Sequence, residues 1–476
     1  MPVRVLYIVA LIEWFSTLAV QIIAMRLAIP VVGSSIVLTS VFLGIILLAL
    51  SAGYWSGGIV ADRYSKSSII KVLWWALLFA GIWYVMIAFS FEVQLLEMLL
   101  ESTQKYILTL FLTSILLFFV PIFIASHSIP LLTELLPDLS KGKSAGKMLF
   151  ASTIGSFLWS VLTSIFFFQT IGVYNTAVMV GCSLCFLAAV VYMYAQRQMA
   201  IWAVVIWLLQ LFVFGIVLAP EVDGYYHDSA YQQIHIYDRL YEDRPIRVFS
   251  LNDAYSSAIY TDDVWGTPFQ YINETISLTR ELQPKNILVI WSAGFVYPQL
   301  IAEYPYISEI DTIDIDPEVL DVTQNHFLQT DLHPKISFFP YSGRYAVTSF
   351  LNQQKSYDLI FLDAYNGKSI PDELVTQEFF IWIQDLLSDE WVLIANLIMD
   401  SELRSDFSQK VFATLSSVRD NIYQKNITQN TNTTDNFLIT TQKFDGYITV
   451  VSTSNELYTD NLSTAEVDVV EMLYMR

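Results

Sequence analysis

The chain has 476 residues, of which 54% are hydrophobic, and a formal net charge of −20 at pH 7. Residues 1–220 hold 10 Lys/Arg and 7 Asp/Glu, whereas residues 221–476 hold 15 Lys/Arg and 38 Asp/Glu, so the acidity belongs to the C-terminal part. This charge argues against nucleic acid as a partner, because phosphates attract basic surfaces. It fits either a solvated acidic surface or a cationic ligand such as a polyamine.

Residues 1–220 contain seven apolar stretches, each long enough to cross a bilayer as a helix of about 20 residues. Helix is the expected structure because every backbone polar group must be satisfied within the hydrocarbon. The stretches are about 5–29, 36–60, 70–91, 106–130, 148–169, 176–195 and 200–219. The segment 92–105 carries three glutamates and is expected at the interface. The sequence thus predicts a multi-pass membrane domain with the lipid bilayer as its partner.

The positions of Lys and Arg predict which loops face the cytoplasm. With a cytoplasmic N-terminus, the inner loops hold eight basic residues and the outer loops hold only Arg26 and Lys105. Seven spans then place the acidic part outside the cytoplasm. One miscounted span, most easily within 92–130, would place it in the cytoplasm instead.

Several features of the spans have a structural and a functional interpretation. Glu13 and His127 are ionisable at membrane depth, where such residues are costly and often functional, but a buried partner on another helix would also explain them. Gly53, Gly57 and Gly58 are expected to let two helices pack closely, and this interpretation is favoured over a ligand site. The segment Gly142–Lys147 is one residue short of a phosphate loop and lacks the following Ser or Thr, so no such loop is predicted.

After Pro220, short apolar segments alternate with helical patterns. Strands are expected at 246–251, 256–261, 287–290, 309–316, 335–340, 357–363, 391–397, 437–441 and 447–452, and helices at 268–282, 296–304 and from Pro317. This alternation predicts a parallel, doubly wound sheet. We expect three parts: a transmembrane domain at 1–220, a small β segment with a linking helix at 221–285, and a Rossmann-like, methyltransferase-type α/β domain at 286–476.

In such a sheet, ligands bind at the carboxyl ends of the strands. The strand from Glu309 ends in Asp314-Ile-Asp316, and Asp314 could accept the ribose hydroxyls of an adenosyl cofactor, whereas Asp316 suits a helix N-cap. The strand from Tyr357 ends at Asp363. A carboxylate there could hold a cationic amine and take up its proton, although a loop cap is the structural alternative.

Two groups of residues resemble bacterial membrane-fused spermidine synthase-like proteins, the polyamine aminopropyltransferase family. The first lies in the initial two spans: Arg26, Pro30, Gly33, Ser34, Gly53, Gly57, Gly58, Ala61, Asp62 and Arg63. The second is the loop that follows Asp363, through Ala364-Tyr365-Asn366-Gly367 to Phe380. The resemblance implies a cell inner membrane protein that transfers an aminopropyl group from decarboxylated S-adenosylmethionine to a small cationic amine.

The same resemblance implies roles for individual residues. Asp363 would be the catalytic carboxylate. Asp314, Gly294 and Ser342 would lie at the adenosyl co-substrate. Tyr271, Glu274 and Asn366 would lie at the amine, and Tyr255-Ser-Ser257 would occupy the place of a substrate loop. No metal is expected, and a zinc or redox role for Cys182 and Cys185 is disfavoured because both lie in an apolar helix.

The sequence departs from the family pattern at the co-substrate. Trp291 and Phe295 replace small residues of a glycine-rich turn, Ser342 replaces an acidic residue, and Asn366 replaces the second acid of the catalytic loop. Three interpretations therefore stay open: an aminopropyltransferase, an S-adenosylmethionine-dependent methyltransferase, and a non-catalytic domain that binds a polyamine or a partner. A homo-oligomer is possible under each of them.

Overall fold

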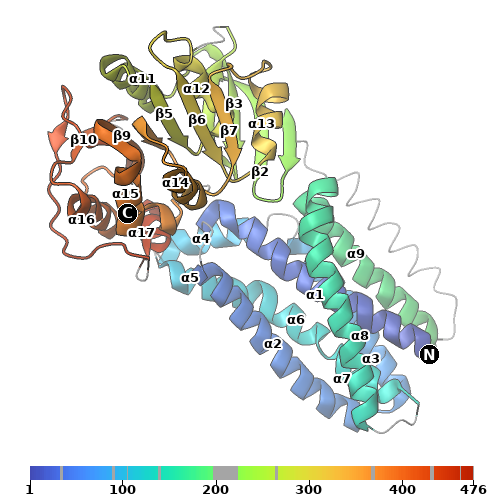
Figure 1. Cartoon of the computed structure of the whole chain (residues 1–476). Helices are drawn as coiled ribbons and strands as arrows, with labels where there is room; N and C mark the ends of the chain where they lie inside the picture. The colour runs from blue at the N-terminus through green and yellow to red at the C-terminus, as the bar shows by residue number, and fades with distance from the viewer. Residues whose placement is uncertain are drawn as a thin grey trace. The chain divides into compact units, whose positions relative to one another are not determined.

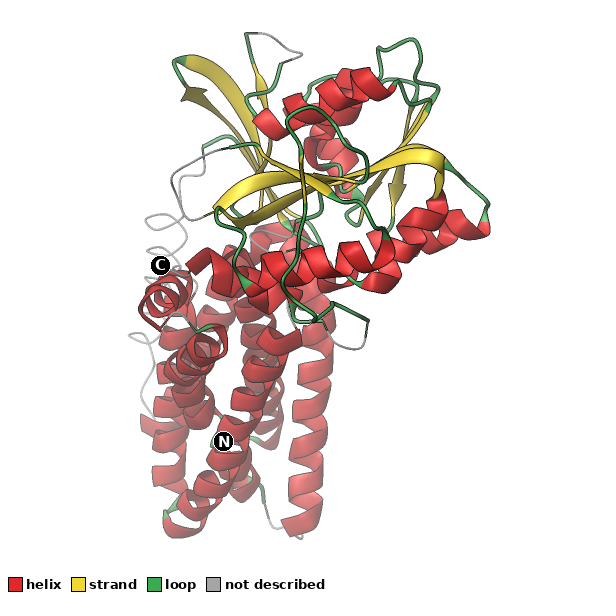
Figure 2. Ribbon diagram, turned by 90° about the vertical axis from the view of Figure 1, so that its left-hand side faces the viewer, coloured by secondary structure: helices red, strands yellow, loops and turns green. Residues whose placement is uncertain are grey.

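The computed structural model describes residues 1–32, 36–87, 92–103, 105–137, 141–196, 223–262, 266–365, 370–428, 434–460 and 463–474. The chain divides into two compact units, one within residues 1–221 and the other consisting mainly of Val222–Arg476. Figure 2 shows that the first is built of helices and that the second mixes helices with strands. We describe each unit by itself.

The first unit contains helices of differing length (Figure 1). They are α1 (Val3–Val32), α2 (Ile36–Arg63), α3 (Lys66–Met86), α4 (Glu92–Thr103), α5 (Tyr106–Ser114), α6 (Val120–Ala125), α7 (Ser128–Leu135), α8 (Lys141–Leu162) and α9 (Phe168–Gln196). Short π-helical turns at Ile115–Phe119 and Thr163–Phe167 join α5 to α6 and α8 to α9.

Five segments of the described chain are long and apolar enough to cross a membrane. They are Val3–Ile29, Ile36–Arg63, Lys66–Met86, Tyr106–Leu135 and Gly142–Tyr194. The last has 53 residues, about twice the length that one crossing needs. It breaks at Gly172, where φ is 80° and the backbone is not helical. The predicted spans 148–169 and 176–195 lie on either side of this break. The predicted span 200–219 lies outside the described residues, so the total of seven stays a prediction.

The polar residues noted in the apolar spans have partners on other helices. Glu13 is fully buried and accepts hydrogen bonds from Ser128 Oγ at 2.7 Å and from Thr17 Oγ1 at 3.2 Å. Ser56 Oγ lies 3.1 Å from His127 Nε2. A Cβ atom at Gly57 would lie 2.9 Å from the Cα of His127, so this glycine does let α2 pack closely against a neighbour, as expected.

The second unit begins with a four-stranded antiparallel meander. Its strands are β1 (Tyr225–Asp228), β2 (Gln233–Tyr241), β3 (Arg244–Leu251) and β4 (Ala254–Tyr260), in that order. The expected strands at 246–251 and 256–261 correspond to β3 and β4. The sequence analysis missed β1 and β2, since only Ile234 and Ile236 give β2 an apolar face and charged residues follow them.

An eight-stranded sheet forms the centre of this unit, with the order β12-β10-β11-β9-β8-β5-β6-β7. The strands are β5 (Asn286–Ile290), β6 (Glu309–Asp314), β7 (Ile336–Pro340), β8 (Tyr357–Leu362), β9 (Leu387–Asp400), β10 (Tyr423–Asn426), β11 (Thr434–Thr440) and β12 (Ile448–Thr449). Strands β5 to β9 pair in parallel, as predicted. The expected strand at 437–441 corresponds to β11, which runs antiparallel to both β9 and β10, so the sheet as a whole is mixed.

Helices cover both faces of this sheet (Figure 1). They are α11 (Gln270–Leu282), α12 (Val296–Ile301), α13 (Glu318–Val322), α14 (Gly343–Asn352), α15 (Gln377–Leu386), α16 (Asp406–Val418) and α17 (Ala465–Tyr474). One buried cluster joins the sheet to α14–α17, and a second joins its other face to α11–α13 and to the meander. Side chains alternate between the two clusters along β5, with Leu288 and Ile290 in one and Ile287 and Val289 in the other. This alternation explains why the strand is apolar throughout.

Candidate functional site

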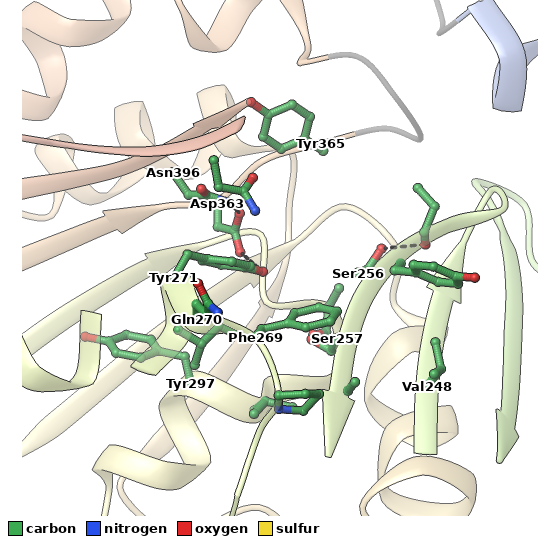
Figure 3. Close-up of a pocket in the computed structure, with 18 of the residues that line it drawn as sticks. Val248, Ser256, Ser257, Phe269, Gln270, Tyr271, Tyr297, Asp363, Tyr365 and Asn396 are labelled. Carbon is green, nitrogen blue, oxygen red and sulfur yellow. Dashed lines mark hydrogen bonds between the residues drawn. The ribbon is translucent and has the colours of Figure 1, made fainter. Parts of the chain in front are cut away.

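The order of the strands switches at β5, which pairs in parallel with β6 on one side and with β8 on the other. Ligands bind at the carboxyl ends of strands at such a switch point. A cavity of about 700 Å³ opens here (Figure 3). Its lining comes from the meander, from the turn after β5, from the start of α11 and from the ends of β8 and β9.

Asp363 is the acidic group at the inner wall of this cavity. It follows β8 directly, as the sequence predicts. Its Oδ2 accepts a hydrogen bond from the Tyr271 hydroxyl at 3.0 Å, and its Oδ1 accepts one from Asn396 Nδ2 at 2.8 Å (Figure 3). Burial raises the pKa of Asp363 to about 6, although both hydrogen bonds favour the ionised form and oppose the rise. The carboxylate can therefore take up a proton near neutral pH.

Aromatic rings form much of the remaining wall. Phe269 and Tyr271 come from the start of α11, Tyr297 from α12, and Tyr365 from the segment after β8. Among the described residues, no Lys or Arg forms an ion pair with Asp363. A carboxylate with neutral hydrogen-bond donors and several aromatic faces suits an organic cation, because ring faces attract positive charge.

The three residues predicted at the adenosyl co-substrate do not line this cavity. Asp314 lies at the end of β6, as expected, but its side chain is only 1% exposed. Asp314 Oδ1 accepts a hydrogen bond from the backbone of Asp316, and burial raises its pKa to about 8. Ser342 caps α14 by accepting a hydrogen bond from Tyr345 N at 3.4 Å.

The turn Trp291–Phe295 packs against neighbouring aromatic rings. A Cβ atom at Gly294 would lie 2.8 Å from the ring of Phe327. The Phe295 ring is fully buried, with its centroid 5.4 Å from that of Phe338. In this arrangement the residues present do not form an open adenosyl site.

The same turn is held in a costly conformation. Trp291 has a φ of 72° and Phe295 a φ of 52°, in the left-handed region that bulky side chains rarely adopt. Two buried polar atoms of this turn, Trp291 Nε1 and Ser292 Oγ, and the Oδ2 atom of Asp314 have no hydrogen-bond partner within the described parts of the chain. Strained backbone and unsatisfied polar groups of this kind gather at functional sites.

Of the residues predicted to lie at the amine, some line the cavity and others do not. Tyr271 lines the cavity and contacts Asp363, and Tyr255, Ser256 and Ser257 line the cavity from β4. Glu274 does not line it. Its Oε1 lies 2.7 Å from Lys425 Nζ in a partly buried ion pair. Asn366 lies outside the described residues.

Sequence analysis did not identify Asn396, which lies on β9 and donates to Asp363. Its Oδ1 is a further buried polar atom without a hydrogen-bond partner in the described structure. One signal was present: Asn396 is a single polar residue inside the apolar run from Trp391 to Met399. A polar group in a buried strand requires a hydrogen-bond partner, which for the Asn396 side chain is the Asp363 carboxylate.

The fold and site define a class: an α/β domain with a doubly wound sheet and a cavity at its switch point that is lined by a carboxylate and aromatic rings. No family model matches the chain. The polyamine aminopropyltransferase of Vibrio vulnificus is 35% identical over 136 residues, which are 28% of this chain and 45% of that protein. The polyamine aminopropyltransferase of Alkaliphilus metalliredigens is 26% identical over 131 residues, covering 26% of this chain and 45% of that protein. The chain is thus similar to proteins of this name over 26–28% of its own length, and it spans less than half the length of these curated relatives.

Three solved structures align with part of the chain. A probable spermidine synthase from Corynebacterium glutamicum aligns with a TM-score of 0.39 and 16% identity, covering 50% of this chain and 84% of that one. The spermidine synthase from Thermotoga maritima aligns with a TM-score of 0.37 and 18% identity, covering 46% and 72%. Human methyltransferase-like protein 13 in complex with SAH aligns with a TM-score of 0.32 and 20% identity, covering 43% and 90%.

Proposed function

We propose that the second unit is an aminopropyltransferase-type domain whose cavity binds a small aliphatic amine at Asp363. One observation carries the proposal: the Asp363 carboxylate lies at the cavity wall, oriented by Tyr271 and Asn396, with aromatic rings around it. The similarity to proteins named polyamine aminopropyltransferase supports the same conclusion.

The chemistry of an acceptor site follows from this geometry. An alkyl amine with a pKa near ~10.4, with lysine as the reference, is almost fully protonated at neutral pH. The ionised Asp363 attracts this ammonium group and fixes its position. An oxygen of this carboxylate can accept one proton from the ammonium, which frees the nitrogen lone pair. That lone pair would then attack the carbon next to the sulfonium of the donor, and the C–S bond would break with its electron pair leaving on the sulfur as a neutral thioether. Tyr271 and Asn396 hold the carboxyl plane in one orientation, so that an oxygen stays directed at the amine.

Binding of the aminopropyl donor would require a change in the conformation of the turn Trp291–Phe295. Decarboxylated S-adenosylmethionine could reach Asp314 only if Trp291 and Phe295 moved away from their present positions. Release of two strained residues and three unsatisfied polar atoms would offset part of the cost of that movement. A methyltransferase using S-adenosylmethionine would need the same opening but no acid beside an amine, so Asp363 favours aminopropyl transfer.

A second candidate is an amine-binding domain without transfer activity, which the closed turn favours. A transfer assay separates the two. The purified full-length protein is incubated with decarboxylated S-adenosylmethionine and putrescine, and the amine product is measured by mass spectrometry. We expect product with the natural protein and at least about a 100-fold loss in Asp363→Asn, the usual scale for a general base. Asp385→Asn is the control, because Asp385 is exposed on α15, outside the cavity.

Equal product from Asp363→Asn and the natural protein would contradict the assignment of Asp363. Absence of product from the natural protein, together with amine binding that depends on Asp363, would establish the binding-only function. We further propose that the protein is a multi-pass protein of the cell inner membrane, on the basis of its apolar helices and its bacterial relatives.

A further inference from the structure

A groove lies on the membrane unit between α1 and α8, with a volume of about 730 Å³. Its walls are apolar, from Ile8, Leu11 and Ile12 on α1 and from Phe150, Ala151 and Ile154 on α8. Ile8, Phe150 and Ile154 are exposed on the unit's surface. In a helix bundle that crosses a bilayer, an exposed apolar groove is filled by lipid chains.

The groove has a closed end and an open end. At Gly155 the two helices touch, since a Cβ atom there would lie 2.2 Å from the carbonyl oxygen of Leu11. Nine residues earlier, a Cβ atom at Gly146 would meet nothing within 4 Å. The helices therefore diverge towards the start of α8, and the missing side chain at Gly146 keeps that end open.

Two lysines line the open end. Lys143 and Lys147 are four residues apart on α8, so both side chains project from the same face of the helix. Both are exposed, and neither forms an ion pair with any residue that the structure describes. Tyr7 lines the same end from α1. The groove thus has apolar walls and, at one end, two lysines that form no ion pair with the described residues.

We propose that this groove is a binding site for an anionic glycerophospholipid. One acyl chain lies along Leu11, Ala151 and Ile154, and the headgroup phosphate lies between Lys143 and Lys147. Basic side chains at the ends of membrane helices attract anionic headgroups, and burial of the chain stabilises the complex in proportion to the apolar area covered. The segment Gly142–Lys147 would then bind phosphate through its lysines as part of a helix, and not through the backbone of a phosphate loop.

Native mass spectrometry of the full-length protein in detergent, with added phosphatidylglycerol or phosphatidylcholine, tests the proposal. We expect phosphatidylglycerol to be retained more strongly. In Lys143→Gln/Lys147→Gln its affinity should fall roughly 25-fold, to that of phosphatidylcholine, because each lysine near an anionic headgroup contributes about fivefold. Lys66→Gln/Lys71→Gln is the matched control, since these exposed lysines lie on α3, outside the groove.

A second variant tests the groove independently of charge. Gly146→Leu should fill the open end without a clash and lower the retention of both lipids, whereas Gly142→Leu, at an equally open position outside the groove lining, should not. Equal retention of the two lipids by the natural protein would overturn the proposal. So would an unchanged affinity in the double lysine variant. Displacement of phosphatidylglycerol by inorganic phosphate at the same concentration would overturn it as well, because the site would then be one for a free anion.

Discussion

The hydroxyl of Tyr271, on α11, lies 3.0 Å from Oδ2 of Asp363, at the end of β8, and donates a hydrogen bond to it. The two residues are 92 positions apart in the chain. This contact joins the helix that precedes the sheet to the strand that carries the acid. It also fixes the orientation of the Asp363 carboxylate, which lines the cavity together with several aromatic rings.

The pKa of Asp363 sets the pH dependence of amine binding. The amine stays protonated between pH 5 and 8, so binding depends on ionised Asp363 and should be lost as pH falls through about 6. Tyr271→Phe removes a hydrogen bond that favours the carboxylate, so the midpoint of this loss should move to higher pH. Calorimetric titration with putrescine at several pH values measures it. Tyr447→Phe is the control, because Tyr447 donates to Glu274 and does not line the cavity. A midpoint unchanged in Tyr271→Phe would contradict the account.

Glu274 offers a test of which acid contacts the amine. Its Oε1 already lies 2.7 Å from Lys425 Nζ and accepts a hydrogen bond from the Tyr447 hydroxyl at 3.4 Å. We therefore expect Glu274→Gln to change putrescine affinity less than about twofold. The lost ion pair should lower stability by about 1 kcal/mol or less, since the pair is partly exposed. A large loss of affinity in this variant would instead place Glu274 at the substrate.

Asp314 should make the protein less stable as pH rises. Burial raises the folded-state pKa of Asp314 to about 8, whereas its pKa in the unfolded chain is near ~4. Between these two pH values the folded protein keeps a proton that the unfolded chain loses, so the free energy of unfolding falls as the pH rises from about 4 to about 8. Asp314→Asn removes this titration. The variant should match the natural protein near pH 4 and exceed it at pH 8, by several kcal/mol at about 1.4 kcal/mol per pKa unit. Thermal unfolding at both pH values checks this, and a constant difference between them would contradict it.

The side of the membrane that the second unit faces can be measured directly. The charge bias and seven spans predict that it lies outside the cytoplasm. The native Cys182 and Cys185 are buried and can be replaced by Ala. Asp385→Cys in that background should then react with a membrane-impermeant maleimide in intact cells, whereas Lys66→Cys should not. The opposite pattern would place the unit in the cytoplasm and show that a span was miscounted.

The sequence predicted those features that depend on local pattern. Alternating apolar segments gave β5 to β9 and their parallel pairing, and the ends of β6 and β8 gave Asp314 and Asp363. The direction of β11 could not be predicted, because an apolar run such as Phe437–Ile439 carries no information about the orientation of its neighbours. The strands β1 and β2 were missed since little of their surface is apolar.

The site was harder to predict because it depends on distant partners. Glu274 was expected at the amine, but it does not line the cavity and forms an ion pair with Lys425, 151 residues away in the chain. Ser342 acts as a helix cap, which its position before α14 would have suggested. Trp291 and Phe295 were recognised as departures from the family pattern. Only the structure shows that Phe327 and Phe338 pack against this turn and that the Asp314 side chain is buried.

The central claim is that the cavity binds an amine through Asp363. Calorimetric titration of the full-length protein with putrescine, compared with the same titration of Asp363→Asn and of the control Asp385→Asn, tests it most directly. The account predicts saturable binding by the natural protein and by Asp385→Asn, and at least about a tenfold loss in Asp363→Asn, as expected when a buried charge partner is removed. Equal binding by all three proteins, or no binding by any, would contradict the claim.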